Sequence, residues 1–148
     1  MDGTQAGLRQ LRARAGGYVH FSADGLIAGI GYYHMAPDQL DRYRRAVADD
    51  TQGAELVGII GRLSAERIQV GGSASLKTAP KGYPRDHPRV DLLRHKGLIA
   101  WRHWPVAAWL HTAAAKRRVA DFLRTAAPLQ AWLDEQVGQS TTAQPAQR

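Results

Sequence analysis

The sequence predicts an α+β domain in which a small antiparallel sheet, starting with a β-hairpin, packs against about four to five helices. Two observations carry this prediction. Runs of aromatic and β-branched residues flank an Asp-Gly pair near the N-terminus, and apolar residues recur at helical spacing further along the chain. The 148 residues suit one domain with its own hydrophobic core. We assign residues 1–16 to a loose N-terminal segment, 17–137 to this domain and 138–148 to a disordered tail.

The first expected element is a hairpin. Asp24-Gly25 separates residues 18–23 from residues 26–33, and this dipeptide favours a type I′ turn, which needs positive φ at both central residues. Alternation along the second strand places Gly29 and Gly31 on one face. Two glycines on one face indicate that something approaches the sheet closely there. We interpret the approaching group as a packed helix, with a ligand as the alternative.

Two helices are predicted directly after the hairpin. The first opens at Ala36-Pro37-Asp38, because proline suits a first turn and an acid there favours the positive end of the helix dipole. The sequence at 49–51 breaks this helix and can cap the second, which carries an apolar stripe from Leu56 to Leu63. We expect Pro128 to kink the last helix or split it in two. The other expected elements are a strand at 67–70, an extended piece at 76–78, a loop at 79–88, a short helix at 88–96, a strand at 98–104 and the last helix from 112.

Composition and missing motifs exclude several kinds of site. The chain has no cysteine, which excludes disulfides, a thiolate nucleophile and cysteine-ligated metals. It lacks the phosphate-binding Gly-x-x-x-x-Gly-Lys-Ser/Thr loop, the dinucleotide-binding Gly-x-Gly-x-x-Gly motif and the Gly-x-Ser-x-Gly nucleophile elbow. No two histidines have the i, i+4 spacing of a helical zinc site. We therefore expect no metal and no cofactor.

The N-terminus and the hydropathy pattern bear on the compartment. Residues 1–14 are polar and basic and contain no apolar core of a secretory signal. No apolar run approaches the length of a membrane-spanning helix. We expect a cytoplasmic protein that does not associate with a membrane.

The positive charge of the protein is concentrated in one stretch. The net charge is +7, and the segment from Lys77 to Arg118 holds ten basic and two acidic residues, which leaves a balance of −1 for the remainder. A basic surface attracts phosphates, nucleic acid or acidic partners. For nucleic acid the support is weaker, because no regularly spaced stacking aromatics accompany the run Lys116-Arg117-Arg118, which suits a solvated helix face.

The candidate ligand site lies within Lys77–Lys96. A rigid Pro-Gly loop that runs into a helix start can present backbone N–H groups to an anion, and basic side chains around it add charge-assisted hydrogen bonds. An adjacent Asp-His pair could handle a proton. The alternative is structural, with Asp86 capping the helix and Arg94 and Lys96 balancing its C-terminal end. No catalytic residue can be assigned. The candidate ligand-binding residues are Lys77, Lys81, Tyr83, Asp86, His87, Arg94, His95 and Lys96.

Several blocks of residues, in order, resemble a known family. These are Gly31-Tyr32-Tyr33 with Ala36–Leu40 and Tyr43-Arg44, then Leu76–Tyr83 with Asp86-His87-Pro88 and Asp91–Gly97, then Pro128-Leu129 with Trp132-Leu133. Together they are similar to a widespread bacterial family, the domain of unknown function 2461, over about residues 17–137. The resemblance implies an α+β domain in a bacterial, cytosolic protein, and it implies no reaction.

The sequence departs from the family in one respect. Members usually carry a longer N-terminal half with a basic segment, and nothing like it is found in residues 1–16. The chain would then correspond to the C-terminal part of the family domain, and its hairpin could expose a sheet edge that favours homo-oligomers. Three hypotheses follow: a small-anion (phosphate or carboxylate) binding module or truncated enzyme, a non-specific nucleic-acid binder through residues 77–118, and a structural or interaction protein. Whether the protein is an enzyme is left open.

Overall fold

The computed structural model describes residues 11–12, 17–72 and 74–141. These residues form an antiparallel sheet of five strands in the order β1-β2-β3-β5-β4. The strands are β1 (Leu11–Arg12), β2 (Tyr18–Ser22), β3 (Gly25–Tyr32), β5 (Leu98–Trp104) and β4 (Gln69–Gly71). The helices are α2 (Pro37–Ala48), α3 (Asp50–Ala65), α4 (Val90–Leu93), the short 3₁₀ helix η2 (Ala108–His111) and α5 (Ala113–Gln136). The predicted fold class is confirmed.

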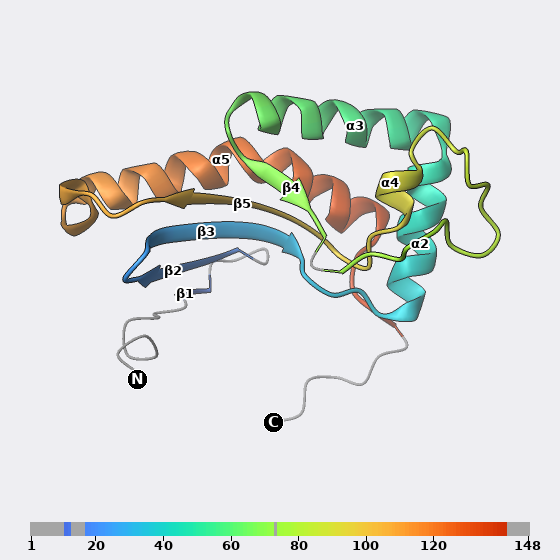
Figure 1. Cartoon of the computed structure of the whole chain (residues 1–148), viewed down its shortest axis with the longest axis horizontal. Coiled ribbons are helices and arrows are strands. Elements are labelled where there is room, and N and C mark those ends of the chain that lie inside the picture. Colours follow the sequence, from blue (N-terminus) through green and yellow to red (C-terminus); the bar gives the residue numbers. More distant parts are fainter. Residues whose placement is uncertain (1–10, 13–16, 73, 142–148) are drawn as a thin grey trace.

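The core lies between the sheet and its longest helix. In Figure 1, α5 runs along the sheet with α3 beside it, while α2 stands at the end where β3 finishes. Leu26, Ala28 and Ile30 alternate along β3 on the face toward α5, and all three are buried. Trp104 of β5 packs edge-to-face on Phe122 of α5 with ring centroids 6.3 Å apart. This packing fixes the position of α5 relative to the strands.

The hairpin between β2 and β3 is confirmed, but its turn differs from the prediction. Ser22 pairs with Gly25, so Ala23 and Asp24 are the two central residues. Neither has a positive φ, whereas a type I′ turn requires one at both positions. Gly25 adopts a φ of 126° directly after the turn. The type I′ prediction is wrong because the Asp-Gly pair lies one residue beyond the centre of the turn.

The groups that lie against the glycines of β3 come from neighbouring strands and not from a helix. The ring of Tyr18 in β2 lies over Gly29, where an added Cβ would lie 2.6 Å from a ring carbon. Gly31 has a φ of 118°, and a Cβ there would lie 2.4 Å from the carbonyl oxygen of Leu98 in β5. Because α5 packs on the opposite face of β3, the packed-helix interpretation is wrong. A neighbouring ring and a close backbone approach explain these two glycines.

Other predicted elements differ in extent. The expected helix at 88–96 is limited to the four residues of α4, and the extended piece at 76–78 is replaced by a single bridge between Ser75 and His95. Helix α5 continues through Pro128, so of the two predicted outcomes the split is wrong, and the kink stays a prediction. Part of the predicted loose start forms β1, and residues 1–10 and 13–16 of that start lie outside the described residues. No helix in the described part of the chain is long and apolar enough to span a bilayer.

Candidate functional site: a polar hollow at the end of α5

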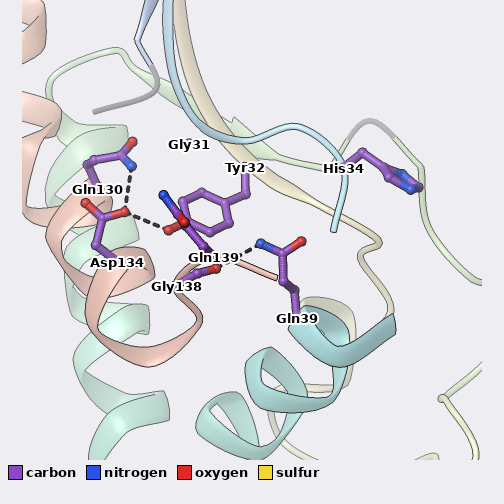
Figure 2. Close-up of a pocket in the computed structure, with 8 residues that line it drawn as sticks. All are labelled: Gly31, Tyr32, His34, Gln39, Gln130, Asp134, Gly138 and Gln139. Atoms are coloured by element: carbon purple, nitrogen blue, oxygen red, sulfur yellow. Dashed lines mark hydrogen bonds between the residues drawn. The ribbon is translucent and has the colours of Figure 1, made fainter. Parts of the chain in front are cut away.

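A polar hollow lies between the end of β3, the start of α2 and the end of α5 (Figure 2). Its volume of about 690 Å³ falls within the range of roughly 300–1,000 Å³ that small-molecule sites occupy. None of its described lining residues is a lysine or an arginine, and the one carboxylate among them belongs to Asp134. The lining residues are Gly31, Tyr32, His34, Gln39, Gln130, Asp134, Gly138 and Gln139.

Asp134 connects the two walls that β3 and α5 contribute. Its Oδ1 accepts a hydrogen bond from the Tyr32 hydroxyl at 2.7 Å and another from Gln130 Nε2 at 3.0 Å. Gln130 and Asp134 are four residues apart on α5 and therefore lie on the same side of the helix. Burial and the hydrogen bond to Asp134 raise the pKa of Tyr32 above its ordinary value. Tyr32 consequently stays protonated at neutral pH and continues to donate to the carboxylate.

Asp134 determines the orientation of the side-chain amide of Gln130. An ionised carboxylate only accepts hydrogen bonds, so the amide must turn its nitrogen toward it and its oxygen away. Gln130 is 7% exposed, and its Oε1 is buried without a hydrogen-bond partner among the described residues. A buried carbonyl that lacks a partner costs about 1–3 kcal/mol. Gln130, a lining residue of the hollow, thus carries a buried acceptor that the described part of the chain does not satisfy.

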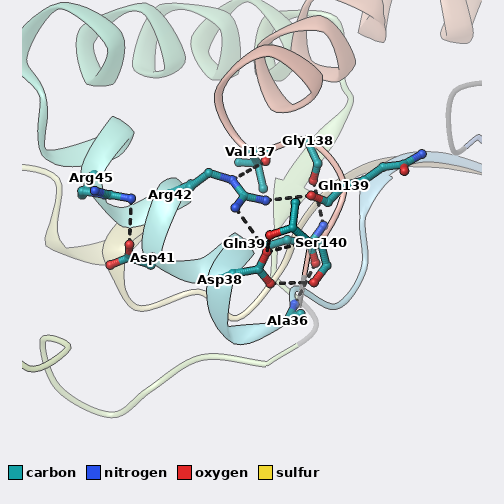
Figure 3. Close-up of polar contacts among 11 residues, drawn as sticks. Ala36, Asp38, Gln39, Asp41, Arg42, Arg45, Val137, Gly138, Gln139 and Ser140 are labelled. Atoms are coloured by element: carbon teal, nitrogen blue, oxygen red, sulfur yellow. Dashed lines mark hydrogen bonds and ion pairs between the residues drawn. The ribbon is translucent and has the colours of Figure 1, made fainter. Parts of the chain in front are cut away.

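Gly138 and Gln139, which line the hollow, belong to residues 137–141, which we call the C-terminal strap. Figure 3 shows the strap lying against the first turns of α2. Gln39 Nε2 donates to the carbonyl of Gly138 at 2.8 Å, and the Arg42 guanidinium donates to the carbonyls of Val137 and Gln139 at 2.7 and 2.8 Å. The shape of the hollow therefore depends on contacts between α2 and the strap.

Asp38 holds the end of the strap. Its carboxylate accepts hydrogen bonds from Ser140 Oγ at 2.6 Å and from the Thr141 backbone N–H at 2.8 Å, and it pairs with Arg42 at 3.2 Å. The expectation that an acid would begin α2 was therefore correct, but this acid also binds a distant segment. Residues 138–141 belong to the stretch predicted as a disordered tail, and residues 142–148 lie outside the described residues.

The eight residues predicted as a ligand site lie elsewhere, and none of them lines the polar hollow or the two smaller hollows that α5 forms with α3 and with β5. Among the described residues, no hydrogen bond or ion pair joins two of these side chains to each other. Their environments are mixed: Lys77, Lys81, Asp86 and Lys96 are exposed, and Tyr83, His87, Arg94 and His95 are partly buried. Asp86 does not cap α4, whose first turn receives no side-chain cap.

Arg94 and His87, two partly buried residues of this segment, form hydrogen bonds within the segment itself. Arg94 Nε donates to the Leu76 carbonyl at 2.8 Å, and its NH1 pairs with Asp91 at 3.2 Å. His87 Nδ1 accepts a hydrogen bond from the backbone N–H of Arg89 at 3.0 Å. These contacts organise the loop, so an anion site in this segment would depend mainly on its exposed lysines.

Arg89 has a structural role that the sequence did not reveal. Its Nε donates to the carbonyl of Val47 at 2.6 Å, and its NH2 donates to the carbonyl of Ala48 at 3.1 Å. These carbonyls belong to the last turn of α2, where helical carbonyls have no partner within the helix. The guanidinium passes close to Gly53 of α3, where a Cβ would lie 2.4 Å from Nε. A cation in the predicted ligand loop therefore joins α2 and α3.

The basic stretch does not form one compact surface. In Figure 1 the loop that follows residue 77 lies at one end of the long axis, and the start of α5, with Lys116–Arg118, lies at the other. Within this stretch, Arg102 lies 5.3 Å from the ring centroid of Trp104, and Arg118 lies 4.4 Å from that of Trp109. Because its charges are separated in this way, the stretch offers less support for nucleic-acid binding than its composition indicates.

The sequence analysis missed the residues of the polar hollow, although α5 contains one usable signal. Gln130 falls on the apolar face of the helix, next to Leu129 and among the buried positions Ala126 and Leu133. A glutamine at such a position must find a partner, and an acid four residues later can supply one. Nothing along the chain indicated that Tyr32 would reach the same carboxylate.

Fold and site together define an α+β protein with an antiparallel sheet and a polar hollow at the end of its longest helix, whose described lining holds no lysine or arginine. The chain belongs to the family described as "Conserved hypothetical protein (DUF2461)", whose family model matches residues 4–132. This match confirms the family resemblance seen in the sequence blocks. Searches of curated proteins and of solved structures found no match to the chain.

Proposed function

We propose that this protein binds a small polar ligand in the hollow between β3, α2 and α5. The observation that carries the proposal is the buried, unpartnered Oε1 of Gln130. Because this oxygen is fully buried, a ligand N–H or O–H group would reach it only after the Gln130 side chain turns toward the hollow, and that hydrogen bond would remove the cost of leaving the oxygen unsatisfied. The polar lining and the volume of the hollow support a ligand of modest size.

The charges around the hollow favour a ligand that is neutral or positively charged. The lining residues include the Asp134 carboxylate and no lysine or arginine. Both described hydrogen bonds to Asp134 use Oδ1, which leaves Oδ2 for a donor on the ligand. The nearby Arg42 guanidinium is paired with Asp38 and bonded to strap carbonyls. An amine, an amide or a polyol suits these groups, whereas a phosphate or carboxylate ligand would face an unpaired carboxylate.

A titration with three probes of similar size tests this proposal against the anion hypothesis. Propylamine, propionamide and inorganic phosphate are added to the ¹⁵N-labelled protein, and amide chemical shifts are followed by NMR. We expect the amine and the amide to shift Gly31, Gly138 and the side-chain amide of Gln130. For such small probes the dissociation constant should be in the millimolar range, on the order of −4 kcal/mol. Shifts produced by phosphate alone, within residues 77–96, would instead support the anion-binding hypothesis.

Two variants and one control make the test specific to the proposed groups. Gln130→Met keeps the size of the side chain and removes the acceptor, so it should weaken amide binding about tenfold, equivalent to ~1.4 kcal/mol. Asp134→Asn should weaken amine binding more than amide binding, since only the amine carries a charge. Gln136 lies on the same helix outside the hollow, so Gln136→Met should change neither the affinity for the amine nor the affinity for the amide. Equal affinity in Gln130→Met and the natural protein would refute the proposal.

A further inference from the structure

Away from the hollow, two side chains have the geometry of a nucleophile and its base. Ser75 and His95 face each other across an isolated antiparallel bridge, and Ser75 Oγ lies 2.8 Å from His95 Nδ1. In this register they form a non-hydrogen-bonded pair, in which opposed side chains approach most closely. The backbone hydrogen bonds on either side run from Leu76 N to the Arg94 carbonyl and from Lys96 N to the Ala74 carbonyl.

The position of the His95 ring is restricted by the backbone at Gly72. A Cβ on Gly72 would lie 2.8 Å from His95 Nδ1 and 2.9 Å from the carbonyl oxygen of Gly97. The ring therefore occupies space that only a glycine leaves open. Ser75 is exposed and His95 is half-buried, so a substrate can reach the hydroxyl while the base is held in place.

The protonation state of His95 suits a base. Its pKa is lowered, first by burial and then by the neighbouring Arg94 guanidinium, while Asp91 acts in the opposite direction. The imidazole is consequently neutral at physiological pH. With its proton on Nε2, Nδ1 can accept the hydrogen bond, and later the proton, of the serine hydroxyl.

We propose that Ser75 is a nucleophile, with His95 as its general base, that accepts an acyl group from an activated ester. Ser75 Oγ forms a bond to the acyl carbon while its proton passes to His95 Nδ1. The ester C–O bond breaks, the leaving alcohol or phenol takes the proton from His95, and the acyl group remains on Ser75 as an ester. A water molecule that attacks this ester, with its proton passing through His95 to Ser75 Oγ, would release the carboxylic acid and restore the hydroxyl.

Labelling of the full chain with an ethoxy fluorophosphonate tests this assignment directly. Ser75 Oγ attacks phosphorus, fluoride leaves, and the adduct stays on the serine, where peptide mass spectrometry locates it. We expect one adduct, on Ser75, in the natural protein. His95→Gln should slow its formation by about 100-fold or more, because a general base contributes roughly 10²–10⁴-fold to such steps. The labelling rate should also fall as the pH is lowered through a midpoint below 6.5, the ordinary pKa of histidine.

Two further variants separate the base from a merely structural contact. Gly72→Ala adds a Cβ against the His95 ring, so it should reduce labelling while Ser75 is still present. Ser64→Ala, which removes an exposed serine of α3, should leave labelling unchanged. Absence of an adduct on Ser75 in the natural protein, or equal labelling rates in natural protein and His95→Gln, would overturn the assignment. The readout is independent of the polar hollow.

Discussion

Replacing Arg89 with methionine should lower the free energy of unfolding by about 3 kcal/mol, since each charge-assisted hydrogen bond contributes roughly 1.5–3 kcal/mol. The guanidinium satisfies the carbonyls of Val47 and Ala48 at the end of α2, and its side chain is only 14% exposed. A cation also favours the negative end of the helix dipole. Its ion pair with Asp50 adds little, because that carboxylate is fully exposed. Urea unfolding followed by circular dichroism measures the change.

The matched control for this variant is Arg85→Met in the same loop. Arg85 is exposed and makes no described hydrogen bond or ion pair, so its loss should change stability by less than about 0.5 kcal/mol. If the two variants were equally stable, the proposed support of α2 by Arg89 would be wrong. If Arg85→Met reduced phosphate binding and Arg89→Met did not, the result would support anion binding by the exposed part of the loop.

Gly31→Ala should destabilise the fold by about 3 kcal/mol or more, through backbone strain and a steric clash together. The residue has a φ of 118°, which an L-residue with a Cβ rarely adopts. The new Cβ would lie 2.4 Å from the carbonyl oxygen of Leu98, a backbone atom that cannot move without loosening β5 from β3. Thermal unfolding measures the change in stability, and the shape of the polar hollow should change as well, since Gly31 is one of its lining residues.

A second glycine provides a control with the opposite sign. Gly61 lies in α3, is exposed, and has no atom within 4 Å of an added Cβ. Gly61→Ala should therefore stabilise the protein by about 0.5–1 kcal/mol, because alanine is the better helix former. A destabilisation of less than about 1 kcal/mol in Gly31→Ala would mean that β3 can relax at this point.

The proposed ligand site lies outside the segment of the sequence that is richest in basic residues. The basic segment that drew attention in the sequence uses Arg89 and Arg94 to bind backbone carbonyls of its own surroundings. The hollow that we propose as the ligand site contains no lysine or arginine among its described lining. The charge pattern alone therefore predicts an anionic ligand. The Gln130 oxygen, which has no partner among the described residues, favours a ligand that carries a hydrogen-bond donor. The NMR titration decides between these ligands.

The sequence by itself determined the elements whose signals are local. An Asp-Gly pair between two runs of aromatic and β-branched residues predicted the hairpin, and helical spacing with a proline in the first turn predicted α2. The Asp49 carboxylate caps α3 by accepting from the backbone N–H groups of Thr51 and Gln52, as the break between the two helices indicated. Successive blocks of residues also identified the family correctly. Each of these features depends on residues a few positions apart, so the chain order is sufficient to reveal it.

Only the tertiary structure decided which polar groups meet. Tyr32 and Asp134 are 102 positions apart, Gln39 and Gly138 are 99 apart, and Arg89 and Val47 are 42 apart. The first two contacts arise because α5 packs on β3 and returns its C-terminal end to the start of α2, and the third arises because the segment that leads into α4 packs on α2. Local propensity carries no information about that packing, which depends on how apolar faces from distant elements fit together. The hollow, its unpartnered amide oxygen and the Ser75–His95 pair all follow from it and from the pairing of distant segments.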